Sequence, residues 1–177
     1  AVVASGNASS KQENDFTVKV DVTGLSASTT YYYQFTSGST KSVIGKTKTA
    51  PSSGAETIRL GLSNCANFPV GYFTAYRDMA LRGDLDAVLN LGDYIYEYGD
   101  NDDLRPHIPS NEIVELDDYR ARYSQYRLDP DLRLAHQHIP FISLWDDHEF
   151  ANDSHKTGAD NHDPSTEGSW DDRVIAA

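Results

Sequence analysis

Apolar and polar residues alternate along the first fifty residues in the way that is typical of half-buried β-strands. Every second residue is apolar over 16–22, and three aromatic residues fall on one face of 29–35. Residues 42–49 fit one more strand, and glycines mark the turns between these segments. The pattern therefore predicts the last strands of a small β-sandwich, with too few strands to close one.

From residue 56 onward the pattern changes to short apolar runs that alternate with segments of helical periodicity. The apolar runs, each of strand length, lie at residues 58–62, 86–91 and 139–144. Helices are expected over residues 72–82, 115–127 and 130–136. Gly83 is placed to end the first helix, and Asp129-Pro130 is placed to start the third. This order of strands and helices predicts an α/β fold.

The change of pattern divides the chain into two parts joined by a linker. We expect residues 1–50 to be the C-terminal strands of a fibronectin III-like sandwich domain, 51–55 to be the linker, and 56–177 to be the α/β part. The N-terminus has no initiator Met, and a helix opened by a capping box at Ser169 stops at Ala177. We therefore expect the chain to have been cut from a longer one.

Each of the three apolar runs ends in polar residues of the kind that bind metal ions. Cys65 follows the first run, Asp93 follows the second, and the third leads into residues 146–149, which read Asp-Asp-His-Glu. In open α/β sheets, ligands collect outside the carboxyl ends of the strands. Three strands that all end in this way predict one shared site.

The residues after the first two runs have both a chemical and a structural interpretation. Gly92 allows a tight turn before Asp93, whose carboxylate is able to bridge two cations, although an isolated Gly-Asp is also a common turn. A phenolate at Tyr96 suits Fe(III), whereas its aromatic neighbours favour simple packing. Cys65 is a candidate nucleophile, a candidate metal ligand or a small buried side chain. The three-strand convergence favours the chemical interpretation of Asp93 and leaves the other two open.

The third cluster is dense in oxygen ligands. Asp146, Asp147 and, further along, Asn152 offer carboxylate and amide oxygens, which suit Ca²⁺ or another hard cation. A neutral imidazole at His148 suits a transition metal or a proton-transfer role. The alternative is a solvated acidic helix start. The preceding apolar run argues against it, because such a run buries the strand and aims its end at a site.

Composition narrows the classes of function. The 177-residue chain has a formal net charge of −12, so its field repels phosphates, and we expect no nucleic-acid-binding surface. A phosphate substrate would then need local cations, and metal ions are one source of them. The single cysteine excludes an internal disulfide, and no apolar run is long enough to span a bilayer.

The order of these motifs resembles the PhoD family of alkaline phosphatases and phospholipase D-type phosphodiesterases. The most specific match is residues 91–98, which read Leu-Gly-Asp-Tyr-Ile-Tyr-Glu-Tyr. Residues 63–67 and 145–149 resemble further family motifs in the family's order, and residues 24–51 resemble the end of its N-terminal sandwich domain. The resemblance implies a calcineurin-like metallophosphoesterase fold, a four-layer α/β/β/α sandwich, preceded by strands of a partial β-sandwich.

The same resemblance implies a site that holds Fe³⁺ and Ca²⁺. The metal ligands implied by motif are Cys65, Asp93, Tyr96, Asp146, Asp147 and Asn152. Cys65, Asp93 and Tyr96 would hold the iron, and Asp93 would also bridge to calcium. Asp93 and His148 would be the catalytic residues, while the choice of direct ligands among residues 146–148 stays open.

By resemblance, residues 56–177 would be the first half of the catalytic domain of a secreted or cell-surface phosphoric ester hydrolase. Its substrate would be a phosphate ester, and cations would neutralise the phosphate oxygens and align an oxygen nucleophile for in-line attack. A calcium-binding module without catalysis is the alternative, because half of a site is able to hold one ion without turnover. Iron content measured together with phosphatase activity would separate the two.

Overall fold

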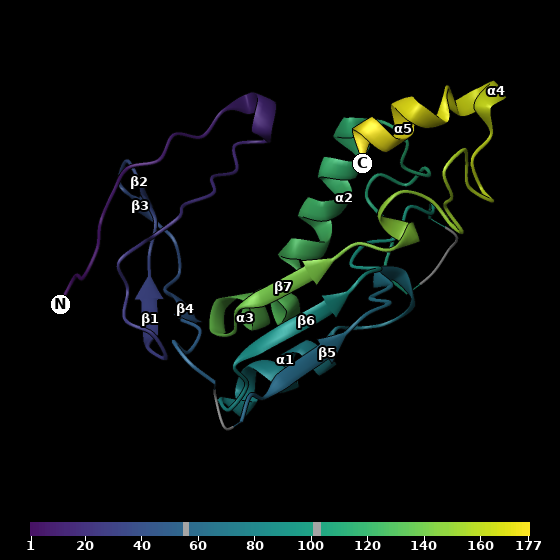
Figure 1. Cartoon of the computed structure of the whole chain (residues 1–177). Helices are drawn as coiled ribbons and strands as arrows, with labels where there is room; N and C mark the ends of the chain where they lie inside the picture. Colours follow the sequence, from purple (N-terminus) through teal and green to yellow (C-terminus); the bar gives the residue numbers. More distant parts are fainter. Residues whose placement is uncertain (55–56, 101–103) are drawn as a thin grey trace.

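A parallel three-stranded sheet, in the order β5-β6-β7, lies at the centre of the computed structural model, which describes residues 1–54, 57–100 and 104–177 (Figure 1). Its strands are β5 (Leu60–Ser63), β6 (Ala87–Leu91) and β7 (Phe141–Leu144). Asn90 of the central strand pairs with Ser63 on one side and with Ser143 on the other. The three predicted strands are confirmed, and because they are parallel, their carboxyl ends share one edge of the sheet.

Helices cover one face of this sheet. Figure 1 shows α1 (Thr74–Arg82) and α3 (Pro130–His138) behind the strands, and α2 (Leu116–Leu128) packs against α3. Gly83 ends α1 in a left-handed conformation, with φ +73°. The Asp129 carboxylate starts α3 by accepting hydrogen bonds from the backbone nitrogens of Asp131 (2.9 Å) and Leu132 (3.1 Å). The predicted helices and both of these end signals are confirmed.

The core lies between the helices and the loops that leave the carboxyl ends of the strands. Its buried members are Ala66, Phe73, Tyr76, Ala80, Tyr94, Ile95, Ile113, Tyr119, Tyr126, Leu132 and Ala135. Many of the rings meet edge to face, as Phe73 and Tyr76 do at 5.7 Å between centroids. The buried Tyr126 hydroxyl accepts a hydrogen bond from the backbone nitrogen of Phe68 (3.0 Å). The loops that carry the candidate site are therefore anchored directly in the core.

The opposite face of the sheet is open to solvent. Its exposed apolar side chains are Leu60, Leu62, Leu91, Ile142 and Leu144, each between 44% and 61% exposed. The expectation that the apolar runs form buried strands therefore holds for the helix-covered face, where Val88 and Asn90 are fully buried, and is wrong for the other. The physical reason is that no layer of the described residues packs against that face.

The N-terminal region contains two antiparallel strand pairs. They join β1 (Thr30–Tyr33) with β4 (Gly45–Lys48), and β2 (Thr36–Ser37) with β3 (Thr40–Lys41). Tyr33 lies opposite Gly45, whose missing side chain leaves room for the tyrosine ring. Lys48 forms an ion pair with Asp86, which directly precedes β6. The strands predicted over 29–35 and 42–49 are confirmed with shorter bounds.

The strand predicted over residues 16–22 is wrong. Only a short 3₁₀ helix, η1 (Gln12–Asn14), precedes this segment, and Val18, Val20 and Val22 are exposed. An alternating pattern gives a strand an apolar face, but the backbone also needs a neighbour to accept and donate its hydrogen bonds. No strand among the described residues supplies one for this segment.

The C-terminal third wraps around the carboxyl edge of the sheet. Short helical segments here are η3 (Asp147–Glu149), α4 (Pro164–Glu167) and α5 (Trp170–Ala176); a further 3₁₀ helix, η2 (Phe68–Val70), lies between β5 and α1. The Ser169 hydroxyl accepts a hydrogen bond from the Asp172 nitrogen (3.1 Å), which confirms the predicted N-cap. Within the described ranges, no helix has the length and apolar character needed to cross a membrane. The predicted linker, 51–55, is irregular over 51–54, and residue 55 lies outside the described residues.

Candidate metal centre

Gly92 brings the ends of β6 and β7 into direct contact. Its φ of +104° favours glycine, and a β-carbon built at this position would lie 2.8 Å from the backbone nitrogen of Asp146. Asp93, the next residue, also has a positive φ, at 52°. Non-glycine residues hold this conformation only where their surroundings impose it, and such positions cluster at functional sites. The local sequence thus places the Asp93 carboxylate beside the segment that begins at Asp146.

The buried carboxylate of Glu149 holds the loop after β6 next to the loop after β7. It accepts hydrogen bonds from the backbone nitrogens of Asp93 (3.0 Å), Tyr94 (2.5 Å) and Asp146 (2.6 Å). Burial raises the pKa of Glu149, and the backbone donors oppose that shift. Glu149 therefore ties the loop after β6 to the loop after β7, a role that the sequence does not assign to it.

The Asp93 carboxylate accepts hydrogen bonds from a thiol and a phenol, and both belong to residues that the sequence predicts to be in the site. The Cys65 thiol lies 3.4 Å and the Tyr96 hydroxyl 3.1 Å from the same oxygen, Oδ2. Asp93 is 7% exposed, and its second oxygen, Oδ1, is buried with no hydrogen-bond partner. A buried carboxylate oxygen without a partner is costly, so its presence indicates a place for a cation.

The electrostatics of these three groups lead to the same conclusion. Burial, followed by the charge of Asp93 and the nearby Cys65, raises the pKa of Tyr96. Burial and the hydrogen bond to Asp93 raise the pKa of Cys65. Both side chains therefore keep their protons beside the Asp93 carboxylate. A bound cation would favour the phenolate and the thiolate instead, because it reverses the sign of the local field.

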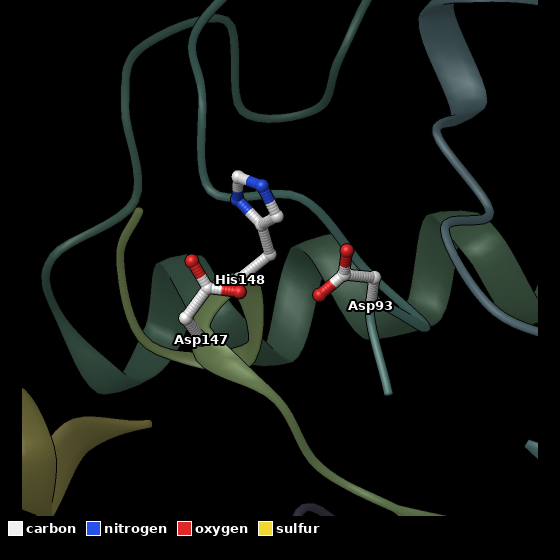
Figure 2. Close-up of side chains that lie close together, drawn as sticks. All are labelled: Asp93, Asp147 and His148. Atoms are coloured by element: carbon white, nitrogen blue, oxygen red, sulfur yellow. The ribbon is translucent and has the colours of Figure 1, made fainter. Parts of the chain in front are cut away.

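Asp147 and His148 complete a second group around Asp93. One ligand atom from each of Asp93, Asp147 and His148 lies within 4.8 Å of the others, and the two carboxylates face each other beside the imidazole (Figure 2). The His148 ring stacks on Tyr96 at 4.2 Å between centroids. These five side chains come from three separate strand ends, as the sequence predicts.

The His148 ring is hydrogen-bonded to a residue that the sequence analysis did not identify. Its Nδ1 lies 2.7 Å from Oε2 of Glu97, which is fully buried. Burial lowers the pKa of His148, but the hydrogen bond and charge of Glu97 outweigh this, so the net shift is upward. The sequence signal for Glu97 is a carboxylate inside a run of buried aromatic residues, where an unpaired charge would be unfavourable.

The remaining two predicted ligands lie at the margin of the cluster. Asp146 contacts the turn at Gly92, and its backbone nitrogen is bound by Glu149. The Asn152 side chain donates a hydrogen bond to Asp153 (3.4 Å), and the Asn152 backbone nitrogen donates to Glu97 (2.7 Å). The structure therefore brings Cys65, Asp93, Tyr96, Asp147 and His148 together, and the ligand roles of these residues, like those of Asp146 and Asn152, stay predictions.

The donor set fits a metal ion. It combines carboxylate oxygens, a phenol, a thiol and an imidazole, which are all metal-ligating groups. Among the described residues, no lysine or arginine forms an ion pair with Asp93 or Asp147. The negative charge of the cluster is thus not balanced by the protein itself. A cation would both balance it and provide a partner for Asp93 Oδ1.

Comparison with known proteins identifies relatives of both parts of the chain. The family model described as "PhoD-like phosphatase" matches residues 60–177, and that described as "PhoD-like phosphatase, N-terminal domain" matches residues 1–51. Alkaline phosphatase D of Bacillus subtilis (strain 168) is 42% identical over 159 residues, which is 85% of this chain and 27% of that protein. A solved structure of PhoD superposes with a TM-score of 0.77 at 39% identity, over 86% of this chain and 30% of that one. The chain thus spans less than a third of the length of these relatives.

Proposed function

This chain belongs to the PhoD-like phosphatase family, and on that premise we propose that it carries the metal-binding part of a phosphoric ester hydrolase. The observation that carries the proposal is the convergence of Cys65, Tyr96, Asp147 and His148 around Asp93, whose Oδ1 is buried without a partner. An acidic site of this kind repels a phosphate ester unless cations are bound in it. The family match does not favour the alternative of a calcium-binding module without catalysis.

The ions that we propose are Fe³⁺ and Ca²⁺, as the family resemblance implies. Cys65, Asp93 and Tyr96 would hold the iron, because a phenolate and a carboxylate are hard donors and Asp93 already links the other two. Asp93 would bridge to the calcium, with the carboxylates of Asp146 and Asp147 and the amide of Asn152 on that side.

When bound, these ions supply the positive charge that binds and polarises a phosphoryl group. The protein's own residues hold and orient the reacting groups. Asp93 and Glu149 fix the loop after β6 at the edge of the sheet. The His148 ring, stacked on Tyr96, has its Nδ1 bound to Glu97, which leaves Nε2 to exchange a proton with an ester oxygen.

We also propose the finer architecture that the family implies, an α/β/β/α sandwich preceded by a β-sandwich domain over residues 1–50 and a linker over 51–55. What supports the first is the open apolar face of the β5-β6-β7 sheet, which a second sheet would cover. What supports the separate N-terminal domain is that the match to the N-terminal-domain model ends at residue 51, whereas the match to the phosphatase model begins at residue 60. A secreted or cell-surface location is part of the same proposal.

Substitution of Asp93 by asparagine tests the proposed function. We expect this chain to bind iron and calcium, and we expect the same of a longer natural protein that contains the chain and has the full length of its relatives. We expect that longer protein to hydrolyse an aryl phosphate, and Asp93→Asn to abolish both binding and hydrolysis. Asp117→Asn is the matched control, because the Asp117 side chain is 93% exposed and lies on α2. Undiminished metal content and hydrolysis in Asp93→Asn would remove the central ligand and, with it, the proposal.

A further inference from the structure

Glu97 is a fully buried carboxylate with three hydrogen-bond partners, of which two are certain donors. Its Oε2 lies 2.7 Å from His148 Nδ1, whereas Oε1 accepts from the Asn152 backbone nitrogen (2.7 Å) and from the Asn161 side-chain amide (2.8 Å). Burial of a carboxylate is unfavourable unless such donors satisfy it. The two oxygens thus have separate partners: Oε1 joins two loop segments, and Oε2 contacts His148.

The backbone on both sides of Glu97 is also fixed. The fully buried Arg122 guanidinium donates hydrogen bonds through Nη1 to the carbonyl oxygens of Tyr96 and, at 2.9 Å, Tyr98. Because the neighbouring peptide groups are bound to one rigid planar group, the direction in which the Glu97 side chain leaves the backbone is determined. The carboxylate is a fixed acceptor and not a mobile one.

A fixed acceptor determines which nitrogen of His148 carries its proton. An ionised carboxylate only accepts, so the ring nitrogen that faces it, Nδ1, has to be the N–H. The neutral imidazole then has its lone pair on Nε2. The ring plane is fixed as well, by stacking on Tyr96 at 4.2 Å and by an edge contact with Tyr98 at 5.4 Å between centroids.

We propose that Glu97 is a positioning residue that holds His148 as the Nδ1–H tautomer, with the lone pair of the neutral ring on Nε2. The consequence for metal binding or proton transfer rests on the proposed function of the candidate metal centre. The tautomer itself follows from the geometry of Glu97 and His148 alone. This separation allows the inference and the proposed function to be tested independently.

Glu97→Gln is the informative substitution because its outcome depends on the direction of one hydrogen bond. Two donors face the position of Oε1, so the amide oxygen has to lie there and the amide NH₂ has to take the place of Oε2. That NH₂ would face His148 Nδ1, which then has to accept. We expect the neutral ring to change from the Nδ1–H to the Nε2–H tautomer.

The measurement is nitrogen-15 NMR of the histidine rings in the full 177-residue chain at mildly alkaline pH, with the His148 signals assigned by their loss in His148→Gln. Glu112→Gln is the matched control. Glu112 accepts from the same Asn161 amide (2.9 Å) and from Arg173 (2.8 Å), and among the described residues it forms no hydrogen bond with His148. The control removes a carboxylate from the same network, and we expect it to leave the tautomer unchanged.

A second readout is the affinity for Ca²⁺ measured by calorimetry. The proposed calcium ligands do not include His148, and the amide oxygen of a glutamine at position 97 still accepts from the Asn152 nitrogen, so we expect the affinity to be unchanged in both Glu97→Gln and Glu112→Gln. Binding of no Ca²⁺ by the unsubstituted chain would contradict the proposed function, and the NMR result would still decide the inference.

Two outcomes overturn the inference whatever the metal does. The first is an unsubstituted chain whose His148 is the Nε2–H tautomer, a measurement that requires no variant to fold. The second is a folded Glu97→Gln chain that keeps the Nδ1–H tautomer. A tautomer that reverses in Glu97→Gln and not in Glu112→Gln supports a positioning role, since a merely structural carboxylate would not change it.

Discussion

Gly92 and Asp146 are in contact across the ends of two strands, with no space for a side chain at the glycine. A β-carbon at Gly92 would lie 3.1 Å from the α-carbon of Asp146 and 2.8 Å from its nitrogen. This contact sets the separation between the loop that carries Asp93 and the loop that carries Asp147 and His148. The geometry of the candidate metal centre therefore depends on the absence of one methyl group.

Gly92→Ala is expected to separate the two loops and weaken metal binding. The left-handed backbone, with φ +104°, costs a non-glycine residue about 1–2 kcal/mol, and the overlap with Asp146 adds about 1–3 kcal/mol. Chemical denaturation measures the loss of stability, and calorimetry with Ca²⁺ measures the loss of affinity.

Gly83→Ala is the control for this substitution. Gly83 also has a left-handed φ, +73°, but a β-carbon there would meet no atom within 4 Å. We expect only the backbone cost and unchanged metal affinity. Equal effects of the two substitutions would show that the Gly92–Asp146 contact does not matter.

Arg122→Lys is expected to destabilise the loop that carries Tyr96 and Glu97. Five backbone carbonyls accept from the buried guanidinium; they belong to Tyr96, Tyr98, Ile108, Pro109 and Asn111. An ammonium group has only three donors and cannot reproduce this planar arrangement. Since hydrogen bonds to charged groups contribute about 1.5–3 kcal/mol each, we expect a loss of at least about 3 kcal/mol in the free energy of unfolding.

The same change at Arg82 serves for comparison. Arg82 forms an exposed ion pair with Asp84 (3.0 Å), and exposed pairs contribute little to stability. Arg82→Lys should leave the unfolding transition almost unchanged. A similar small effect at Arg122 would contradict the assigned anchoring role.

The stability of the chain should decrease as the solution becomes mildly acidic, and His136 should account for part of the loss. Burial, assisted by the charge of Arg127, lowers the pKa of His136 from 6.5 to about 4. Below pH 6.5 the unfolded chain takes up a proton that the folded chain resists, so the stability present at neutral pH is lost as the pH falls toward 4. A shift of this size corresponds to a loss on the order of 3 kcal/mol.

Denaturation curves of the unsubstituted chain and of His136→Gln, recorded across that pH range, measure this contribution. Glutamine does not titrate and is able to form a hydrogen bond with the Tyr94 hydroxyl, which lies 2.9 Å from His136 Nε2. We expect a flatter pH dependence for the variant. Parallel curves would mean that His136 is not the group responsible.

Metal binding should release protons, and its affinity should increase with pH. Both Tyr96 and Cys65 have a raised pKa and donate to Asp93, so a cation that binds the phenolate or the thiolate has to displace their protons. Titration with Co²⁺ in buffers of different ionisation enthalpy measures the number released. Tyr96→Phe and Cys65→Ser should each release fewer protons, and a pH-independent affinity would contradict this picture.

Sequence reasoning was reliable where the local pattern and the end signals agree. Gly83 and Asp129 determine helix ends through their own backbone and side-chain chemistry, so they are visible in the sequence. Cys65, Asp93 and His148 are visible for another reason: parallel strands bring their carboxyl ends to one edge, so residues that follow apolar runs meet.

Features that depend on tertiary partners were missed. The alternation over residues 16–22 predicts a strand, but a strand also requires a neighbour, which no pattern within the segment reveals. Arg122 looks like an ordinary surface charge in the sequence, and the sequence does not show which groups the carboxylates of Glu97 and Glu149 bind. Each is buried because its hydrogen-bond partners come from segments distant along the chain.

The helix cover on only one side of the β5-β6-β7 sheet has a consequence for the chain in solution. The five solvent-exposed leucine and isoleucine side chains on the other side of the sheet form an apolar surface on a chain whose formal net charge is −12. Each side chain is only about half exposed, so shielding it from water would gain roughly 0.7–1.5 kcal/mol, and two copies that meet through this surface would associate favourably. Net negative charge opposes that meeting, and added salt, which screens the charge, should therefore promote self-association.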